Sequence, residues 1–372
     1  MPFKLLRHLC LSGVLLGVTA LPILSKEAAF VKESIRARGM GNAFTAAAND
    51  ESVLFYNPAG LRSVSYNIFE LVSVSATTNV KNSQIPFEAS LNTDDIAVDN
   101  LGSITGKNIH AEVDLSTLSF VNSRFGWTVF GNTFFDFEIH NPVLPYFDVD
   151  AYVQYGGAFG VAWSFADYQL DVGLGGKLIS RSGTRSTFRL TDPAITEAID
   201  GDSEKLQDQF VEDKSSAAFD LGTTYHYEGI HNFPMKLALS FQNITGLDFE
   251  AAGEVPMTMN VGFASESELQ GFDFILATDY RDLTNAQKLA PEGSTFTQRN
   301  LKMGAEIGWE KLNNGHHLLS FRLGRNGSYN TWGFSLNLWK LRLDFAQFSE
   351  EVGGYAGEKE DKRWAFQAGL IF

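Results

Sequence analysis

The chain has 372 residues, with 29 Lys and Arg against 44 Asp and Glu, a net charge of −15. This acidic balance excludes a nucleic-acid partner, which would need basic patches, and 13% aromatic residues with only 20% charged residues argue against disorder. The single cysteine, Cys10, lies near the N-terminus, which excludes a disulfide framework and any cysteine-based metal site.

Residues 1–25 have the pattern of a secretory signal peptide. Lys4 and Arg7 precede an apolar stretch that runs from Leu9 to Leu24 and ends at the small residue Ser25. A membrane anchor is the alternative interpretation. Beyond residue 25 no apolar run approaches the ~20 residues of a membrane helix. We therefore expect an exported protein that has lost its signal peptide and has no spanning helix.

Residues 26–66 form a segment of different composition, rich in Gly, Ala and Asn. Its centre reads RGMGNAFTAAANDESVLFYNPAGL over residues 38–61. Glycine permits unusual backbone angles, and the Asn57-Pro58 pair is typical of a turn. This composition predicts a compact, irregular segment rather than a long helix or a strand.

From about residue 68 onward, apolar and polar residues alternate with a period of two. In 153–165 one face carries Tyr155, Phe159 and Trp163, and the other carries Gln154 and small residues. Such a strand fits either the core of a soluble sandwich or the lipid-facing wall of a barrel.

The pattern repeats in about fourteen segments, most of them as long as the ~9–11 residues of a strand that crosses a bilayer. The predicted strands are 68–79, 109–121, 124–138, 151–165, 168–181, 216–228, 235–243, 256–265, 271–281, 298–310, 316–325, 329–338, 340–349 and 363–372. Long connections such as 182–215 alternate with short ones, with the short link 326–328 as an exception. This sorting favours an all-β fold, a transmembrane antiparallel β-barrel over residues 67–372, and not a sandwich.

A barrel of this size is too wide to be filled by its own side chains, so its lumen is a pore or is plugged. We expect residues 26–66 to be the plug. The inward-facing charges of both signs, among them Asp171, Lys177, Asp279 and Glu306, are expected to pair with one another and with the plug. The alternative is a ring that selects ions in a porin.

The chain ends at Phe372 after alternating aromatic residues, which is typical of outer-membrane barrels and of the signal that the barrel-assembly machinery reads. The other expected partners are outer-membrane lipid and lipopolysaccharide, the latter bridged to acidic loops by divalent cations unless these acids serve solubility alone. These features place the protein in the outer membrane of a diderm bacterium.

The connection 182–215 contains apolar residues at helical spacing, which predicts one or two short amphipathic helices. They are Ile195, Ile199, Leu206, Phe210 and Val211. These residues are candidates for an external groove that receives a hydrophobic ligand, or for a lid packed on the barrel rim. No catalytic Ser/His/Asp set or metal-ligand cluster stands out, so we expect neither enzyme activity nor a cofactor nor a metal site.

The N-terminal segment resembles a known family. Arg38 to Phe44, Asn49-Asp50 and Tyr56 to Leu61 are similar to the signature of the FadL-like outer-membrane proteins, closest to their PorV branch. The resemblance implies a fourteen-stranded barrel with an N-terminal hatch, here shaped by Gly39, Gly41, Asn57, Pro58, Ala59 and Gly60. It also implies transport of hydrophobic compounds such as fatty acids, as in the long-chain fatty acid transporters.

Three functional hypotheses remain open at this stage. The first is passage of a hydrophobic small molecule across the outer membrane through a hatch-gated lumen. The second is a PorV-like role as partner in the secretion or surface attachment of an exported protein. The third is a general porin. The motif describes the hatch and not the cargo, so it does not choose between them.

Overall fold

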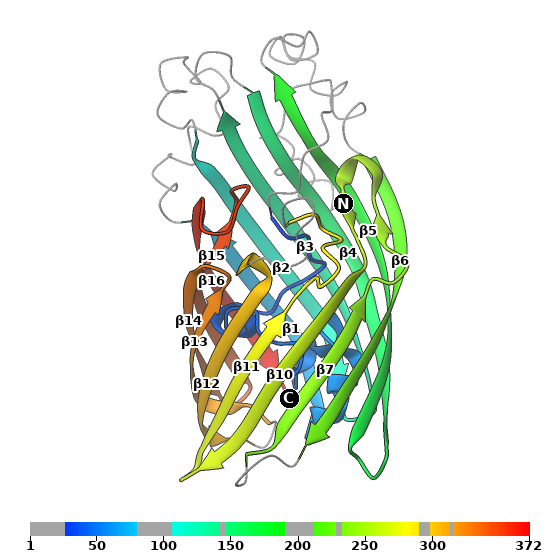
Figure 1. The fold of residues 1–372 in the computed structure, drawn as a ribbon, viewed down its shortest axis with the longest axis vertical. Helices are drawn as coiled ribbons and strands as arrows, with labels where there is room; N and C mark the ends of the chain where they lie inside the picture. Colours follow the sequence, from blue (N-terminus) through cyan, green and yellow to red (C-terminus); the bar gives the residue numbers. More distant parts are fainter. Residues whose placement is uncertain are drawn as a thin grey trace.

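The computed structural model describes residues 27–79, 106–140, 146–189, 212–227, 233–289, 298–312 and 315–372. Fourteen strands form a closed barrel in which neighbours along the chain pair antiparallel (Figure 1). The first and last strands pair from Glu70↔Ile371 to Thr78↔Trp364 and so close the ring. No helix of the described part is long and apolar enough to span a membrane. The predicted signal peptide, 1–25, lies outside the described residues.

Every one of the fourteen predicted segments is a strand of the barrel. The strands are β1 (Ile68–Thr78), β2 (Asn108–Val121), β3 (Phe125–His140), β4 (Tyr146–Phe165), β5 (Leu170–Arg189), β6 (Glu212–Tyr227), β7 (Met235–Gln242), β10 (Thr258–Leu269), β11 (Phe272–Tyr280), β12 (Leu301–Lys311), β13 (His317–Asn326), β14 (Tyr329–Leu338), β15 (Leu341–Glu351) and β16 (Glu360–Ile371). Long and short links alternate as predicted, including the short turn between β13 and β14. We call the two ends of the barrel the long-loop end and the short-turn end.

The predicted bounds of two long connections are wrong. β5 continues to Arg189 and β6 begins at Glu212, so the connection predicted at 182–215 is shorter. The link predicted at 139–150 shrinks in the same way, because β3 ends at His140 and β4 begins at Tyr146. The hydrogen-bonded ladder between β4 and β5 continues beyond the predicted strand ends, because side chains still pair across it. Arg185 on β5 lies 3.1 Å from Asp150 on β4.

Smaller elements complete the described part. Before the barrel stand the α-helix α2 (Ile35–Gly39) and the 3₁₀ helices η1 (Glu51–Phe55) and η2 (Pro58–Ser63). Between β7 and β10 a small hairpin, β8 (Leu247–Asp248) with β9 (Glu254–Val255), encloses η5 (Glu250–Ala252). The last 3₁₀ helix, η6 (Gln298–Asn300), leads into β12.

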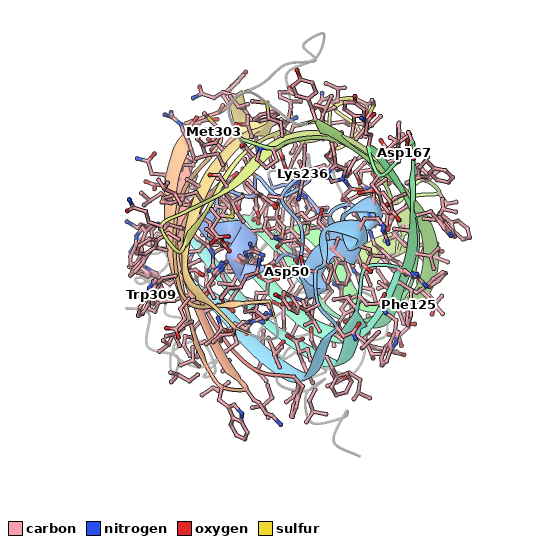
Figure 2. The ribbon with its side chains drawn as sticks, turned by 90° about the horizontal axis from the view of Figure 1, so that it is seen from below. Asp50, Phe125, Asp167, Lys236, Met303 and Trp309 are labelled. Atoms are coloured by element: carbon pink, nitrogen blue, oxygen red, sulfur yellow. The ribbon has the colours of Figure 1, made fainter. Side chains whose placement is uncertain are left out.

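The wall has an apolar outer face and a polar inner face. On β4, Tyr155, Phe159 and Trp163 are exposed, with Phe159 59% accessible, whereas Gln154 is fully buried. Seen along the barrel, Phe125, Met303 and Trp309 lie on the outside of the ring and Asp50 lies within it (Figure 2). An apolar surface of this extent around a closed barrel is stable only against lipid, so the strands cross a membrane.

Candidate functional site

Residues 27–66, here called the N-terminal segment, lie in the lumen and contact walls on different sides of the barrel. Arg36 pairs with Glu306 on β12, and Arg38 pairs with Glu112 on β2 at 2.7 Å. Asn57 bonds to Thr224 on β6 at 3.2 Å. Since β2, β6 and β12 are well separated around the ring, the segment crosses the lumen and does not follow one wall.

Local capping explains why this segment forms short helical turns. The Asp50 carboxylate accepts a hydrogen bond from the Ser52 amide at 3.0 Å and so caps η1. The Asn57 side chain accepts one from the Ala59 amide at 3.1 Å, and Pro58 occupies the first position of η2, where its missing N–H costs nothing. Because each helical turn is short, much of the segment's backbone is left to contact the barrel wall, and the segment packs through its backbone as much as through its side chains.

On one side, the Met40-Gly41 backbone lies directly against glycines of β12 and β13. A Cβ atom at Gly304 would lie 2.3 Å from the Met40 carbonyl oxygen, and one at Gly324 would lie 2.4 Å from the Gly41 nitrogen. Gly41 itself has φ +65°, which an L side chain rarely adopts. The Gly39 carbonyl accepts a hydrogen bond from Thr331 on β14 at 3.0 Å. Gly39 and Gly41 therefore belong to a tight docking contact.

On another side, the Asn57-Pro58-Ala59 turn lies against glycines of β5 and β6. A Cβ at Gly222 would fall 1.9 Å from the Asn57 side-chain oxygen, and one at Gly173 would fall 2.2 Å from the Ala59 nitrogen. Asn57, Pro58 and Ala59 are all buried. Gly60 differs, because it faces its own segment: a Cβ there would meet the Ala48 carbonyl at 2.7 Å. The absence of a side chain at Gly173 and Gly222 leaves the space that the turn fills.

Buried ion pairs join the segment to β12 and β15. The Arg36 guanidinium binds both carboxylate oxygens of Glu306, at 2.8 and 2.7 Å, and also Asp50 at 2.8 Å. Arg342 on β15 pairs with Glu51 of η1 at 2.5 Å. Burial alone would raise the pKa of Asp50, but the Arg36 charge and the Ser52 and Arg36 hydrogen bonds lower it below its usual range. The expected pairing of lumenal charges with the segment is confirmed.

Asp279 on β11 contacts the segment as expected, but through backbone amides that sequence reasoning did not identify. Its carboxylate is fully buried and accepts hydrogen bonds from the amides of Phe44 and Thr45, at 2.7 and 2.6 Å. It therefore holds the middle of the segment through these two backbone amides. The sequence shows only an acidic residue on the inward face of a predicted strand. It does not indicate which backbone amides this residue binds.

The lumen keeps a cavity on each side of the segment. The upper cavity, toward the long-loop end, has about 100 Å³ and is lined by Phe30, Phe134, Val149 and Tyr152 together with charged residues. The lower cavity, toward the short-turn end, has about 290 Å³ and a more polar lining that includes Arg36, Asp50, His316 and Arg342.

Arg181 marks the wall of the upper cavity. Its guanidinium lies between the rings of Tyr152 and Phe249, 4.0 and 4.3 Å from their centroids. It donates hydrogen bonds to the Gln154 side-chain oxygen at 2.8 Å and to the Ala252 carbonyl at 3.2 Å. The hairpin that carries Phe249 is therefore tied to the inner wall of the barrel.

The five candidate ligand residues of the connection after β5 lie outside the described residues; they are Ile195, Ile199, Leu206, Phe210 and Val211. Within the described ranges, no group of three or more His, Cys, Asp or Glu side chains is arranged to hold a metal ion.

No protein-family description matches this sequence, and no curated protein matches it. Among solved structures, the chain is similar to the CymD monoaromatic hydrocarbon channel, with 12% identity, a TM-score of 0.48, and coverage of 92% of this chain and 98% of that one. It is also similar to the Ralstonia pickettii toluene transporter TbuX, with 11% identity, a TM-score of 0.44, and coverage of 94% of this chain and 98% of that one. A third similar structure is that of a Pseudomonas aeruginosa FadL homologue, with 10% identity, a TM-score of 0.39, and coverage of 93% of this chain and 99% of that one. Similarity at this level does not assign a ligand.

Proposed function

We propose that this protein is an outer-membrane transport barrel that passes hydrophobic small molecules, of which fatty acids are the first to test, through a lumen gated by residues 26–66 as a hatch. The observation that carries the proposal is the pair of cavities on either side of the N-terminal segment. A solute that reaches the upper cavity meets the segment as its barrier to the lower one.

The upper cavity offers a receiving site for an apolar molecule. The apolar part of its lining includes Phe30, Phe134, Val149 and Tyr152, and charged side chains make up much of the rest. Burial of an apolar chain against the apolar part is favourable by ~0.8 kcal/mol per methylene. A space of about 100 Å³ holds only part of an extended ligand. Onward passage therefore requires the segment to move.

In this proposal the hatch residues act by shape. Gly39 and Gly41 on one side, and Asn57, Pro58 and Ala59 on the other, seat the backbone against glycines of the wall, while Gly60 keeps the η2 turn close to Ala48. Seating contacts of this kind are discrete, so the segment is either docked or released. Ile195, Ile199, Leu206, Phe210 and Val211 are proposed to receive the ligand before it enters the lumen.

The proposal is tested by native mass spectrometry of the purified barrel during titration with a labelled fatty acid. We expect stoichiometric retention that falls at least tenfold in Tyr152→Leu, whose ring lines the upper cavity. Tyr155→Leu is the matched control, because Tyr155 lies three residues away on the same strand and faces outward, 57% exposed. No retention by the wild type, or equal loss in both variants, would count against a lumenal site.

The strong contacts between the N-terminal segment and the barrel wall favour a second function, that of a PorV-like secretion partner. The buried pairs Arg36–Glu306 and Arg342–Glu51 tie the segment to the wall, as expected of a permanent plug in a PorV-like partner of secreted proteins. That function predicts no affinity for fatty acid and co-purification with an exported protein. A general porin predicts large conductance once the segment is displaced.

A further inference from the structure

A third, narrower cavity lies between the N-terminal segment and the inner faces of β1, β2 and β3. Its volume is about 30 Å³. Hydroxyl groups dominate its walls: Ser52 from the segment, Ser73 and Ser75 from β1, Ser116 and Ser119 from β2, and Thr128 from β3. A wall of hydroxyls attracts water and polar solutes and not apolar ones.

This middle cavity shares lining residues with each of the other two. Lys32 and Glu33 line both it and the upper cavity. Ser34, Glu51 and Gln367 line both it and the lower cavity. The three spaces thus form a row that passes the segment along the β1–β3 wall.

A buried hydroxyl group indicates that the middle cavity holds water. The Ser119 hydroxyl oxygen is buried, with the residue 1% exposed, and it has no hydrogen-bond partner among the described residues. A buried hydroxyl is normally bonded to protein or to ordered water. One water needs about 10–15 Å³ of such volume, so a cavity of about 30 Å³ accommodates one or two.

The charges along the middle cavity favour cations, with one exception. Four carboxylates line it, those of Glu33, Glu51, Glu70 and Asp114, and of its lining residues within the described ranges Lys32 alone is cationic. Asp114 accepts hydrogen bonds from Ser75 and Asn132, at 3.0 and 2.8 Å.

Arginines compensate the other three carboxylates. Glu33 pairs with Arg38 and Arg281, and Arg342 pairs with Glu51 and Glu70. Asp114 is thus the carboxylate most available to a passing cation.

Lys32 stands at the junction with the upper cavity. Its ammonium group contacts the Ser116 hydroxyl and lies 6.0 and 5.8 Å from the ring centroids of Phe55 and Phe130. A positive charge at a narrow junction repels small cations. Replacement of Lys32 by alanine removes this charge and shortens the side chain, which widens the junction.

We propose that this row of cavities is a hydrated pathway along which water and small monovalent cations pass the N-terminal segment while it stays seated, with Lys32 as its electrostatic barrier and Asp114 as its cation-attracting group. The pathway requires no movement of the hatch and no hydrophobic ligand. It therefore stands independently of the proposed transport function.

The test is single-channel recording of the full chain in planar bilayers under a KCl gradient. We expect small, steady conductance steps with a cation-selective reversal potential. Lys32→Ala should raise the unit conductance several-fold and increase cation selectivity, and Asp114→Asn should reduce that selectivity. Ser75→Leu should fill the middle cavity and abolish the steps. Ser180→Leu, the same change on the outer side of β5, is the matched control and should leave them unchanged.

Two results would overturn the pathway. One is the absence of small steps in both the wild type and Lys32→Ala, with folding of each shown by its heat-modifiable migration on gels. The other is an unchanged unit conductance in Lys32→Ala, Asp114→Asn and Ser75→Leu. Lys32→Ala adds no bulk to the lumen, so it tests the pathway even if Ser75→Leu fails to fold. Fatty-acid retention is unaffected by either result.

Discussion

Replacement of Arg36 by methionine should release the N-terminal segment. The Arg36 guanidinium makes two bonds to Glu306, at 2.8 and 2.7 Å, and two more to Asn49 and Asp50. Its loss leaves the Glu306 and Asp50 carboxylates buried with fewer partners. Removal of one member of a buried pair costs about 3–5 kcal/mol. Part of this cost is offset here, because Arg322 still pairs with Glu306 at 2.5 Å.

If the free energy that holds the segment against the wall falls by about 3 kcal/mol, the population of barrels with a released segment rises about 100-fold, since each 1.4 kcal/mol is a factor of ten. Planar-bilayer recording measures this directly, because a barrel without its plug conducts in large steps. Arg325→Met is the matched control: Arg325 lies on β13 with its side chain exposed on the outer face. An open probability in Arg36→Met that stays within twofold of both the wild type and this control would refute the assignment of Arg36 as a seating residue.

Three further predictions concern packing, pH and lipid contact. Gly222→Ala places a methyl group 1.9 Å from the Asn57 side-chain oxygen and should lower the free energy of unfolding in urea by about 1–3 kcal/mol. Gly131→Ala is the control and should be tolerated, because the nearest atom to its new methyl group is 3.6 Å away. If both variants shift the urea transition, followed by gel migration, to the same extent, the docking contact is contradicted. Burial lowers the pKa of His316 below its ordinary 6.5, although Glu51 acts to raise it. The neutral ring therefore contributes its full stability above about pH 6.5 and loses it as the pH falls, so urea midpoints should drop less on acidification in His316→Gln than in the wild type. Phe159→Lys on the outer face should cost about 2–4 kcal/mol of folding free energy in bilayers; no cost would mean that this face does not meet lipid.

The strands could be predicted because their signal is local. In 153–165 the alternation of Tyr155, Phe159 and Trp163 with Gln154 and small residues reflects two solvents, lipid outside and a polar lumen inside. The strand ends were less predictable. β5 and β6 extend beyond the apolar band, where both faces carry mixed residues and the period of two fades, so the sequence predicts a loop where the ladder continues to Arg189.

The contacts of the lumen could not be predicted in the same way, because they join residues far apart in the chain. The turn at Asn57 suggests a plug from its composition, but nothing near it identifies Gly222, 165 positions later (222 − 57), as the surface it packs on. Asp279 and the amides of Phe44 and Thr45 are a second case. A glycine on a strand and an inward acid each have several structural uses, and only the closed barrel selects among them.

The central claim is that the N-terminal segment gates passage of a hydrophobic molecule. The most direct measurement is the flux of a labelled fatty acid into vesicles that contain the double variant Lys32→Cys, Ser116→Cys. The Lys32 ammonium already contacts Ser116 on β2, so a reducible bifunctional thiol reagent spans the pair and ties the segment to the wall without disturbing Arg36. The account predicts saturable flux before cross-linking, loss of that flux after it, and recovery on reduction. Flux that is the same in the cross-linked and reduced protein would contradict it.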